Sequence, residues 1–422
     1  MDGKTKRKRS GIERFFKILG PGLVTGASDD DPSGIATYSQ AGAQFGLATL
    51  WTAFVTFPLM AAIHEMCGRI GIVTSEGLSS NIRNHYHKSI LYLVILFTFP
   101  AVILNIGADI AGMGAVANLI LPSIPTFCFT IAFTAILILL IIYLPYQKMA
   151  AFLKYLCLFL LLYFIVPFLS KQNWTEIAKQ AFIPTIKFNK EFISIIVAIL
   201  GTTISPYLFF WQATMEAEDV KHKEQKLIVD KRIIGKMDLD VNFGMFFSNL
   251  VMFFIILTTG TVLFPAGIHQ IDTVEQAAKA LEPLAGKLSY LLFAMGVIGT
   301  GFLSIPVLSG CLSYMLSETF GWEGGLDKKY YQAKSFYLVV IVSLIVGLGI
   351  NFIGISPVHA LIYTAILYGI TSPVLIVIIL HLSNNKKVMG EFTNGKWSNI
   401  LGILTFLFMT TAAIVLLYFQ IK

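Results

Sequence analysis

The sequence predicts an all-α integral membrane protein with about eleven transmembrane helices, two of them broken near the middle of the membrane. Three observations predict this fold. The 422 residues are 56% hydrophobic and only 13% charged, whereas a soluble domain has about 25% charged residues. Apolar segments long enough to cross a bilayer recur from one end of the chain to the other. In two of these segments a proline follows small polar residues near the middle, which predicts a break in the helix.

The predicted spans are joined by short polar connections, and none of these connections is long enough to form a soluble domain. We therefore expect one transmembrane domain at 17–420, preceded by a basic arm at 1–16. The eleven spans lie near 17–42, 46–68, 90–120, 125–144, 149–170, 191–216, 241–264, 288–316, 335–354, 357–381 and 398–420.

Lysine and arginine residues are unevenly distributed between the two sides of the predicted bundle. If the N-terminus is cytoplasmic, the N-terminal arm and the cytoplasmic loops hold 23 of the 31 Lys and Arg residues, seven lie on the other side, and Lys154 lies just within the fifth span. This distribution follows the positive-inside rule. We therefore predict a multi-pass plasma-membrane protein with a cytoplasmic N-terminus and an external C-terminus. The net charge of +7 reflects this topology and an attraction to anionic lipid, not a nucleic-acid partner.

Three consecutive aspartates, Asp29, Asp30 and Asp31, lie in the middle of the first predicted span and are followed by Pro32. A charge at bilayer depth costs about 2.5–3.5 kcal/mol on insertion scales, so such residues face a cavity or a partner and mark an ion path. The proline breaks the helix and frees backbone carbonyls. A carboxylate beside unwound backbone suits a cation that sheds part of its water.

The sixth span repeats this pattern at Thr202–Pro206, where Pro206 again follows small polar residues. Five spans separate the two starts. We therefore predict two halves of opposite topology, at about 17–170 and 191–381, followed by an extra helix at about 398–420. In transporters built this way, the ion site lies where the two broken helices face each other near the midplane.

Three segments resemble the NRAMP family of divalent metal transporters. They are GPGLVTGASDDDPSGIATYSQAG at 20–42, EMCGRIGIVTSEGL at 65–78 and GTTISPYLFFWQAT at 201–214. The resemblance covers nearly the whole chain. It implies a LeuT-type inverted repeat of five plus five helices, in agreement with the internal repeat.

The resemblance also implies roles for individual residues. Asp31 falls on the family's metal-binding aspartate, and Thr202 falls on a residue whose backbone carbonyl helps to bind the ion. Gly34 stands where the family has a ligand asparagine, Ser205 where it has a ligand methionine, and Tyr207 where it has a histidine of the sixth helix. These departures make the chain more similar to the NRAMP-related magnesium transporters than to the manganese and iron branch.

The departures predict a roomier site for a hard cation. Soft sulfur ligands favour later transition metals, whereas oxygen and water suit Mg²⁺, Ca²⁺ and Mn²⁺. Mg²⁺ keeps several of its waters and is typically held by one or two carboxylates. We expect Asp31 to be the ligand, the Thr202 carbonyl and Ser205 hydroxyl to form one wall, Gly34 to leave space for water, and Asp30 to act through water. Alternatively, the Ser205 hydroxyl bonds back to the preceding turn.

Asp29, Tyr207 and Asp109 are expected in a second shell or along the ion path, although Asp29 could instead cap the broken helix. The resemblance implies that Tyr207 replaces a histidine and Ile106 replaces a proton-accepting aspartate of the family. Because tyrosine does not titrate near neutral pH and isoleucine does not titrate at all, we expect weak or no proton coupling. A dication moving inward gains about 4.6 kcal/mol per 100 mV, which is enough for uptake without a co-ion. His64 and Glu65 are expected to form a cap or salt bridge at the end of the second span.

The main hypothesis is an alternating-access transporter of partly hydrated ions such as Mg²⁺ and Mn²⁺. Its alternative is a proton-coupled Mn²⁺ or Fe²⁺ importer. More distant alternatives are an amino-acid transporter, an intramembrane enzyme that uses paired aspartates, and a metal sensor. The expected partners are divalent cations and the lipid bilayer. No resident cofactor and no obligate protein partner are inferred.

Overall fold

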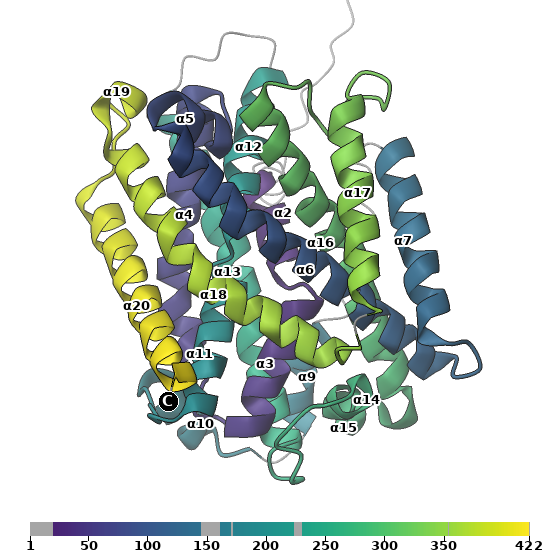
Figure 1. The fold of residues 1–422 in the computed structure, drawn as a ribbon. Helices are drawn as coiled ribbons and strands as arrows, with labels where there is room; N and C mark the ends of the chain where they lie inside the picture. The colour runs from purple at the N-terminus through teal and green to yellow at the C-terminus, as the bar shows by residue number, and fades with distance from the viewer. Residues whose placement is uncertain (1–19, 145–160, 170–171, 223–229, 353, 422) are drawn as a thin grey trace, which may run out of the picture.

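The computed structural model is a bundle of helices whose axes run mainly between two opposite ends (Figure 1). It describes residues 20–144, 161–169, 172–222, 230–352 and 354–421. The basic arm predicted at 1–16 and most of the fifth predicted span lie outside the described residues.

All regular secondary structure in the described part of the chain is helical, and short 3₁₀ helices at Lys279–Leu281 and Gly286–Leu288 flank α15. The α-helices are α2 (Pro21–Asp29), α3 (Pro32–Phe45), α4 (Trp51–Thr74), α5 (Leu78–His85), α6 (Lys88–Ile120), α7 (Thr126–Tyr143), α9 (Leu162–Leu169), α10 (Trp174–Phe182), α11 (Lys190–Thr203), α12 (Pro206–His222), α13 (Lys231–Val262), α14 (Val274–Ala278), α15 (Glu282–Ala285), α16 (Ser289–Phe320), α17 (Lys334–Ile350), α18 (Pro357–Asn384), α19 (Lys386–Met389) and α20 (Lys396–Ile421).

Within the described ranges, seven helices are long and apolar enough to cross a membrane, when α11 and α12 are counted as one helix. The others are α6, α7, α13, α16, α18 and α20, and α17 is a shorter apolar helix. The chain is therefore a multi-pass membrane protein. Ten of the eleven predicted spans coincide with a helix or a broken pair of helices.

The predicted limits of the spans 191–216 and 241–264 are too short where the two spans face each other along the chain. The helix α12 continues to His222, and α13 begins at Lys231, ten residues before the predicted start at 241. Asp230 explains the early start, because its carboxylate accepts hydrogen bonds of 2.9 Å from the backbone N–H groups of Arg232 and Ile233. This cap lets a polar turn extend the helix beyond its apolar part.

Both predicted helix breaks are confirmed. The helices α2 and α3 are separated at Asp30 and Asp31, and α11 and α12 are separated at Ile204 and Ser205. In Figure 1, α2 and α12 occupy one half of the bundle, and α3 and α11 occupy the other. The chain therefore runs through the first broken pair in the opposite direction to the second.

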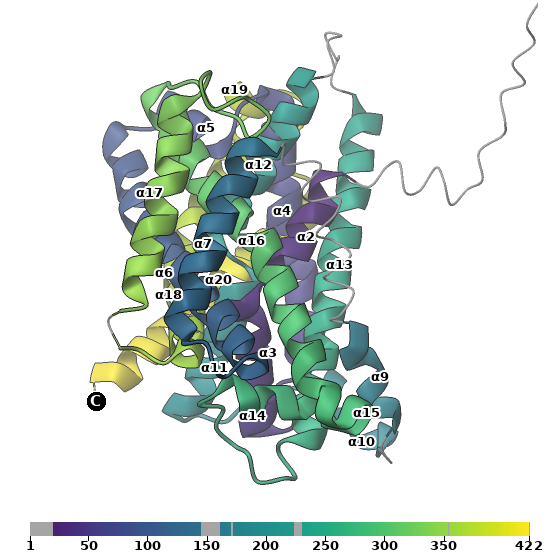
Figure 2. The ribbon, with the colours of Figure 1, turned by 90° about the vertical axis from the view of Figure 1, so that its right-hand side faces the viewer.

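The short helix α2 is fixed to α13, beside which it lies in Figure 2. The carboxylate of Asp240 on α13 accepts the N–H groups of Gly20, Gly22 and Leu23 at 2.8, 2.7 and 3.3 Å. These N–H groups have no partner within their own helix. The cap therefore ties the start of α2 to a long helix that crosses the bundle.

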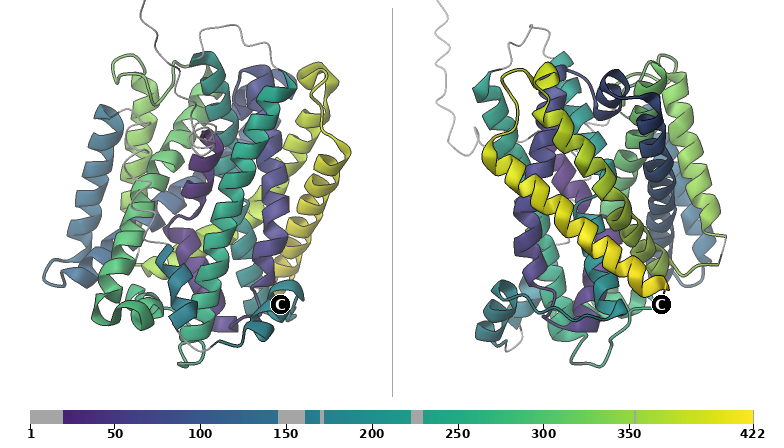
Figure 3. Two further views of the ribbon diagram at one scale, coloured as in Figure 1. Left: turned by 180° about the vertical axis from the view of Figure 1, so that it is seen from behind. Right: turned by 60° about the vertical axis from the view of Figure 1, so that its left-hand side comes forward.

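Two flanks complete the bundle. The last helix, α20, lies on the outside next to α18, as the right-hand view of Figure 3 shows. On the opposite flank, α7 packs against α6 and α17. The helices α5 and α19 lie at one end of the bundle, whereas α10, α14, α15 and the C-terminus lie at the other (Figure 1).

The expectation for His64 and Glu65 is wrong, because both lie inside α4 and not at its end. His64 is fully buried, and its ring meets that of Phe209 at a centroid distance of 5.5 Å. Glu65 accepts a hydrogen bond of 2.5 Å from the side chain of Asn242 on α13. The helix α4 extends to Thr74, so the predicted span ended too early.

We predict that Gly244→Ala destabilises the protein and that Gly235→Ala, on the same helix, does not. A Cβ atom at Gly244 would lie 2.2 Å from the Gly22 carbonyl oxygen, whereas at Gly235 it would meet nothing within 4 Å. Overpacking of this kind costs about 1–3 kcal/mol, while alanine favours a helix by about 1 kcal/mol over glycine. Thermal melting of both variants in detergent measures the difference. Equal melting temperatures would show that α2 and α13 separate freely.

Candidate metal site

The two helix breaks face each other in the interior of the bundle. A Cβ atom at Gly34 would lie 3.2 Å from the Asp29 carbonyl oxygen and 3.4 Å from Thr202 Oγ1. One turn further along α3, the hydroxyl groups of Tyr38 and Thr203 are 3.3 Å apart. The structure therefore brings the start of α3 against the end of α11.

Asp31 is buried at this junction, with 2% of its surface exposed. It is the N-cap of α3, and its Oδ1 accepts the N–H of Gly34 at 2.7 Å. Its Oδ2 accepts a hydrogen bond of 2.9 Å from Nδ2 of Asn105 on α6. Gly34, predicted at the site, thus contributes a backbone donor that orients the carboxylate.

Asp29 and Asp30 share one partner on α13. The hydroxyl of Ser248 lies 2.6 Å from Asp29 Oδ2 and 3.5 Å from Asp30 Oδ1. Both aspartates are buried, and Asp29 Oδ1 has no hydrogen-bond partner. The capping role considered for Asp29 belongs instead to Asp31, because Asp29 is the last residue of α2.

Ser205 and Thr202, which are predicted to form one wall of the site, contact each other. The Ser205 hydroxyl donates a short hydrogen bond to the Thr202 carbonyl. This contact is the local bond that we considered as the alternative role of Ser205. Both oxygens are buried at the break between α11 and α12.

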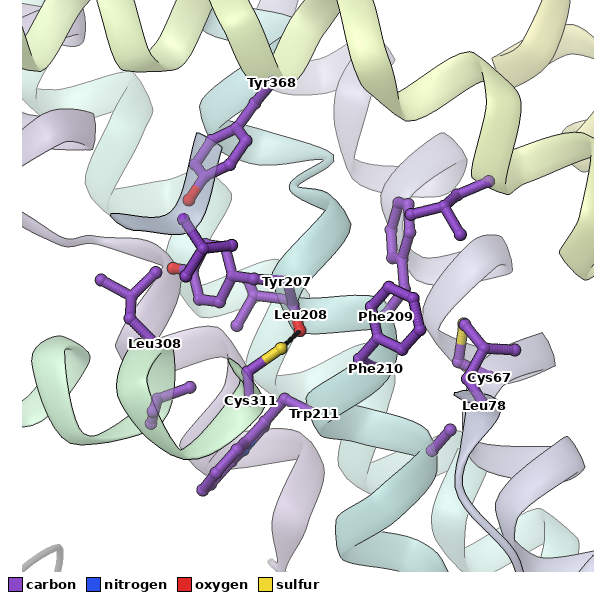
Figure 4. Close-up of a cluster of buried hydrophobic side chains, with 14 of the residues drawn as sticks. Cys67, Leu78, Tyr207, Leu208, Phe209, Phe210, Trp211, Leu308, Cys311 and Tyr368 are labelled. Atoms are coloured by element: carbon purple, nitrogen blue, oxygen red, sulfur yellow. Dashed lines mark hydrogen bonds between the residues drawn. The ribbon is translucent and has the colours of Figure 1, made fainter. Parts of the chain in front are cut away.

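Tyr207 joins the two broken pairs by a different contact. Its hydroxyl donates to the carbonyl of Ser28 on α2 at 3.1 Å. Its ring lies beside that of Tyr368 on α18, at a centroid distance of 5.7 Å (Figure 4). Figure 4 also shows Cys311 of α16, whose thiol donates to the Tyr207 carbonyl at 3.3 Å. Tyr207 therefore connects α2, α12, α16 and α18.

Asp109 lies on α6 and is fully buried. The Ser304 hydroxyl on α16 lies 3.5 Å from its Oδ2, and its Oδ1 has no hydrogen-bond partner. Asp109 is close enough to Asp31 for their charges to interact. Its role in a second shell or along the ion path stays a prediction.

Sequence reasoning missed three polar residues: Asn105 and Ser248, which contact the aspartates, and Thr364, which contacts Asn105. Thr364 on α18 donates to Asn105 Oδ1 at 3.0 Å, and its hydroxyl lies 3.2 Å from that of Ser33. Asn105 precedes Asp109 by four residues, a spacing that places both on one face of a helix. That spacing was the available signal for Asn105.

The residues that the structure describes include no group of three or more His, Cys, Asp or Glu side chains placed to hold a metal ion. A cation at this junction would therefore meet one or two carboxylates and several neutral oxygens. The carbonyls at the ends of α2 and α11 carry the partial negative charge of a helix C-terminus. This donor set suits a hard cation that keeps part of its water.

The chain belongs to the family described as Nramp, natural resistance-associated macrophage protein-like, which matches residues 22–419. It is thus a member of a transporter family and not an enzyme. A curated relative is the divalent metal cation transporter MntH of Caldanaerobacter subterraneus subsp. tengcongensis. The two are 23% identical over 415 residues, which cover 97% of this chain and 95% of the relative.

Solved structures support the same fold. The manganese transporter of Eremococcus coleocola, in complex with an aromatic bis-isothiourea compound, superposes with a TM-score of 0.74 at 19% identity, covering 97% of this chain and 88% of that one. Mhp1, a nucleobase-cation-symport-1 family transporter, gives a TM-score of 0.54 at 14% identity over 95% of this chain and 93% of that one. The fold is therefore LeuT-like, as the resemblance implied.

We predict that Ser248→Ala lowers the stability of the folded protein. The substitution removes the hydroxyl that contacts Asp29 and Asp30, and leaving a buried polar group unsatisfied costs about 1–3 kcal/mol. Ser343→Ala is the matched control, because Ser343 is also buried but donates within its own helix to Val340 at 2.8 Å. Melting temperatures in detergent compare the two. A shift no larger than that of the control would mean that Ser248 does not stabilise the aspartates.

Proposed function

We propose that this chain is a secondary transporter that carries divalent metal cations across the membrane by alternating access. The observation that carries the proposal is the buried Asp31 carboxylate at the junction of two broken, oppositely directed helices. Such a junction is where transporters of this architecture bind ions. The names of the relatives, a divalent metal cation transporter and a manganese transporter, agree with it.

Mn²⁺ is the first candidate ion. The relatives support the Mn²⁺ or Fe²⁺ importer that the sequence left as the alternative better than they support the main hypothesis of a Mg²⁺-type transporter. The second candidate is Mg²⁺. It is favoured by the oxygen atoms at the junction, namely the Asp31 carboxylate, the Thr202 carbonyl and the Ser205 hydroxyl, because hard ions prefer oxygen.

The roles of the other residues follow from their positions. Asp31 is the carboxylate ligand, and Thr202 and Ser205 offer neutral oxygens on the opposite helix break. Asp30 acts through water. Asp29 and Asp109 add negative potential, which lowers the cost of a dication at bilayer depth.

We also propose the orientation of the protein. The end that carries α5 and α19 would face the cytoplasm, and the C-terminus would lie outside. The basic residues Lys231 and Arg232 begin α13, and Lys386 and Lys387 lie in α19. These residues would then be on the cytoplasmic side, as the positive-inside rule requires. The division into repeats at about 17–170 and 191–381 remains part of this proposal.

The proposal is tested by uptake into liposomes that contain the purified protein, with Mn²⁺ and Mg²⁺ compared and internal pH recorded. Mn²⁺ entry with acidification supports the proton-coupled importer. Mg²⁺ entry without acidification supports the weakly coupled transporter of hydrated ions. If neither ion enters above the rate of empty liposomes, the proposed function is wrong.

Asp31→Ala is predicted to reduce uptake to the background of empty liposomes while the protein still folds. The substitution deletes the carboxylate that would bind the ion. Asp272→Ala is the control, because Asp272 is exposed in the loop before α14. Both variants are compared by uptake rate and by their elution as a single species in detergent. Normal uptake by Asp31→Ala would remove Asp31 from the site.

Ser205→Met is predicted to shift ion preference toward Mn²⁺ and Cd²⁺ at the expense of Mg²⁺. A thioether at the helix break adds a soft ligand. Ser205→Ala, which removes the hydroxyl without adding sulfur, should not increase Cd²⁺ uptake. Competition of each ion with Mn²⁺ uptake gives the preference. The same preference in both variants would show that residue 205 does not contact the ion.

A further inference from the structure

The buried amide of Asn105 is the group on α6 that touches the Asp31 carboxylate. Asn105 is fully buried, and its Nδ2 lies 2.9 Å from Asp31 Oδ2. It lies in the long apolar helix α6, far from either end. A buried side-chain amide at this depth needs partners for both its donor and its acceptor.

The opposite side of the amide faces α18. Asn105 Oδ1 accepts from the Thr364 hydroxyl at 3.0 Å. That hydroxyl also lies 2.8 Å from the Leu361 carbonyl and 3.2 Å from the Ser33 hydroxyl. The amide is therefore held between a carboxylate, which only accepts, and a hydroxyl, which either donates or accepts.

This pair of partners permits the amide to turn over. A rotation of 180° about the last side-chain bond exchanges Oδ1 and Nδ2 with little change of shape. In the turned state, Nδ2 would donate to Thr364 Oγ1, whose own hydrogen can move to the Leu361 carbonyl. The contact with Thr364 is thus kept in both states.

Only the interaction with Asp31 changes, from an attractive hydrogen bond to a repulsion between two oxygens. Without a cation, the turned amide would place its oxygen against the carboxylate oxygen, which is unfavourable. With a divalent cation between them, two oxygens side by side become two ligands. The cation itself therefore decides which state of the amide is stable.

The spacing of the two groups suits both states. The observed 2.9 Å is an ordinary N–H···O distance. Neighbouring oxygens in an octahedron around Mg²⁺, with Mg–O distances of about 2.0–2.1 Å, are also about 2.9 Å apart. Asn105 and Asp31 can therefore exchange a hydrogen bond for two adjacent ligand positions without moving apart.

We propose that Asn105 is a direct ligand of the transported cation, and that its amide turns its oxygen from Thr364 toward the ion when the ion binds beside Asp31. This inference rests on the proposed function and adds a neutral oxygen ligand from a third helix. It assigns Asn105 a part in selecting small, hard, octahedral cations. It also links ion binding to α6 and α18, which do not contain the helix breaks.

Two substitutions with opposite expectations test the ligand role. Asn105→Leu removes the amide oxygen and should raise the half-saturation concentration for Mg²⁺ or Mn²⁺ uptake about tenfold or more, with a smaller change in maximal rate. Asn105→Asp keeps an oxygen in place and adds a charge. It should leave the half-saturation concentration at or below that of the wild type while slowing turnover.

Which of the two variants loses more uptake distinguishes a ligand role of Asn105 from a purely structural role as a hydrogen-bond donor. If Asn105 only donates to Asp31, then Asn105→Asp sets two carboxylates against each other and must harm uptake more than Asn105→Leu. That order would overturn the inference. Competition by Ca²⁺ provides a second readout, because loss of a ligand suited to a compact octahedron should reduce discrimination of Mg²⁺ from Ca²⁺.

The pair Asn249→Leu and Asn249→Asp controls for the cost of altering a buried asparagine. Asn249 lies on α13 and bonds to Thr56 and to the Met245 carbonyl. Neither control should change the half-saturation concentration. Asn105→Ala replaces Asn105→Leu if the larger side chain lowers the folded yield.

The same assay separates this inference from the proposed function. Suppose that uptake requires Asp31 but that Asn105→Asp harms uptake more than Asn105→Leu. This result would overturn the ligand role of Asn105 and leave the transporter proposal standing. An absence of uptake by the wild-type protein overturns both.

Discussion

The structure depends on the need to satisfy three consecutive carboxylates at bilayer depth. Asp29 and Asp30 meet the Ser248 hydroxyl on α13, and Asp31 meets its own helix N-terminus and the Asn105 amide on α6. Each of these partners comes from a long helix or from the break itself. The first broken pair of helices is therefore held in the centre of the bundle by the groups that solvate its acids.

The same contacts connect the parts that alternating access would move. Asp240 fixes the start of α2 to α13, and Tyr207 joins α12 to the end of α2. Asn105 and Thr364 connect Asp31 to α6 and α18. A cation that changes the hydrogen bonds of Asp31 would therefore act on several helices at once, which is how a small ligand shifts the balance between two conformations.

Much of the fold could be predicted from the sequence, because prolines and charges in apolar segments have few physical solutions. Pro32 and Pro206 marked both breaks, and the spacing between them indicated the opposite direction of the two pairs. The limits of α13 were less predictable. Its first turns are polar, and the Asp230 cap that extends the helix is visible only once the backbone is placed. His64 and Glu65 were misplaced for a similar reason, since α4 continues past the apolar stretch.

The sequence by itself determined the membrane class and the two broken helices, since local composition controls where a helix can cross a membrane or must unwind. The choice of Asp31 among the three aspartates came from the family resemblance and stays a prediction. The tertiary structure alone decided which neutral side chains contact the three aspartates, and which side chain in turn contacts Asn105. Asn105, Ser248 and Thr364 lie in helices far apart in the chain, and each is a polar residue within a largely apolar stretch. Their roles depend on how each helix is rotated in the bundle, and that rotation follows from close packing, as at Gly22 and Gly244, and not from local sequence.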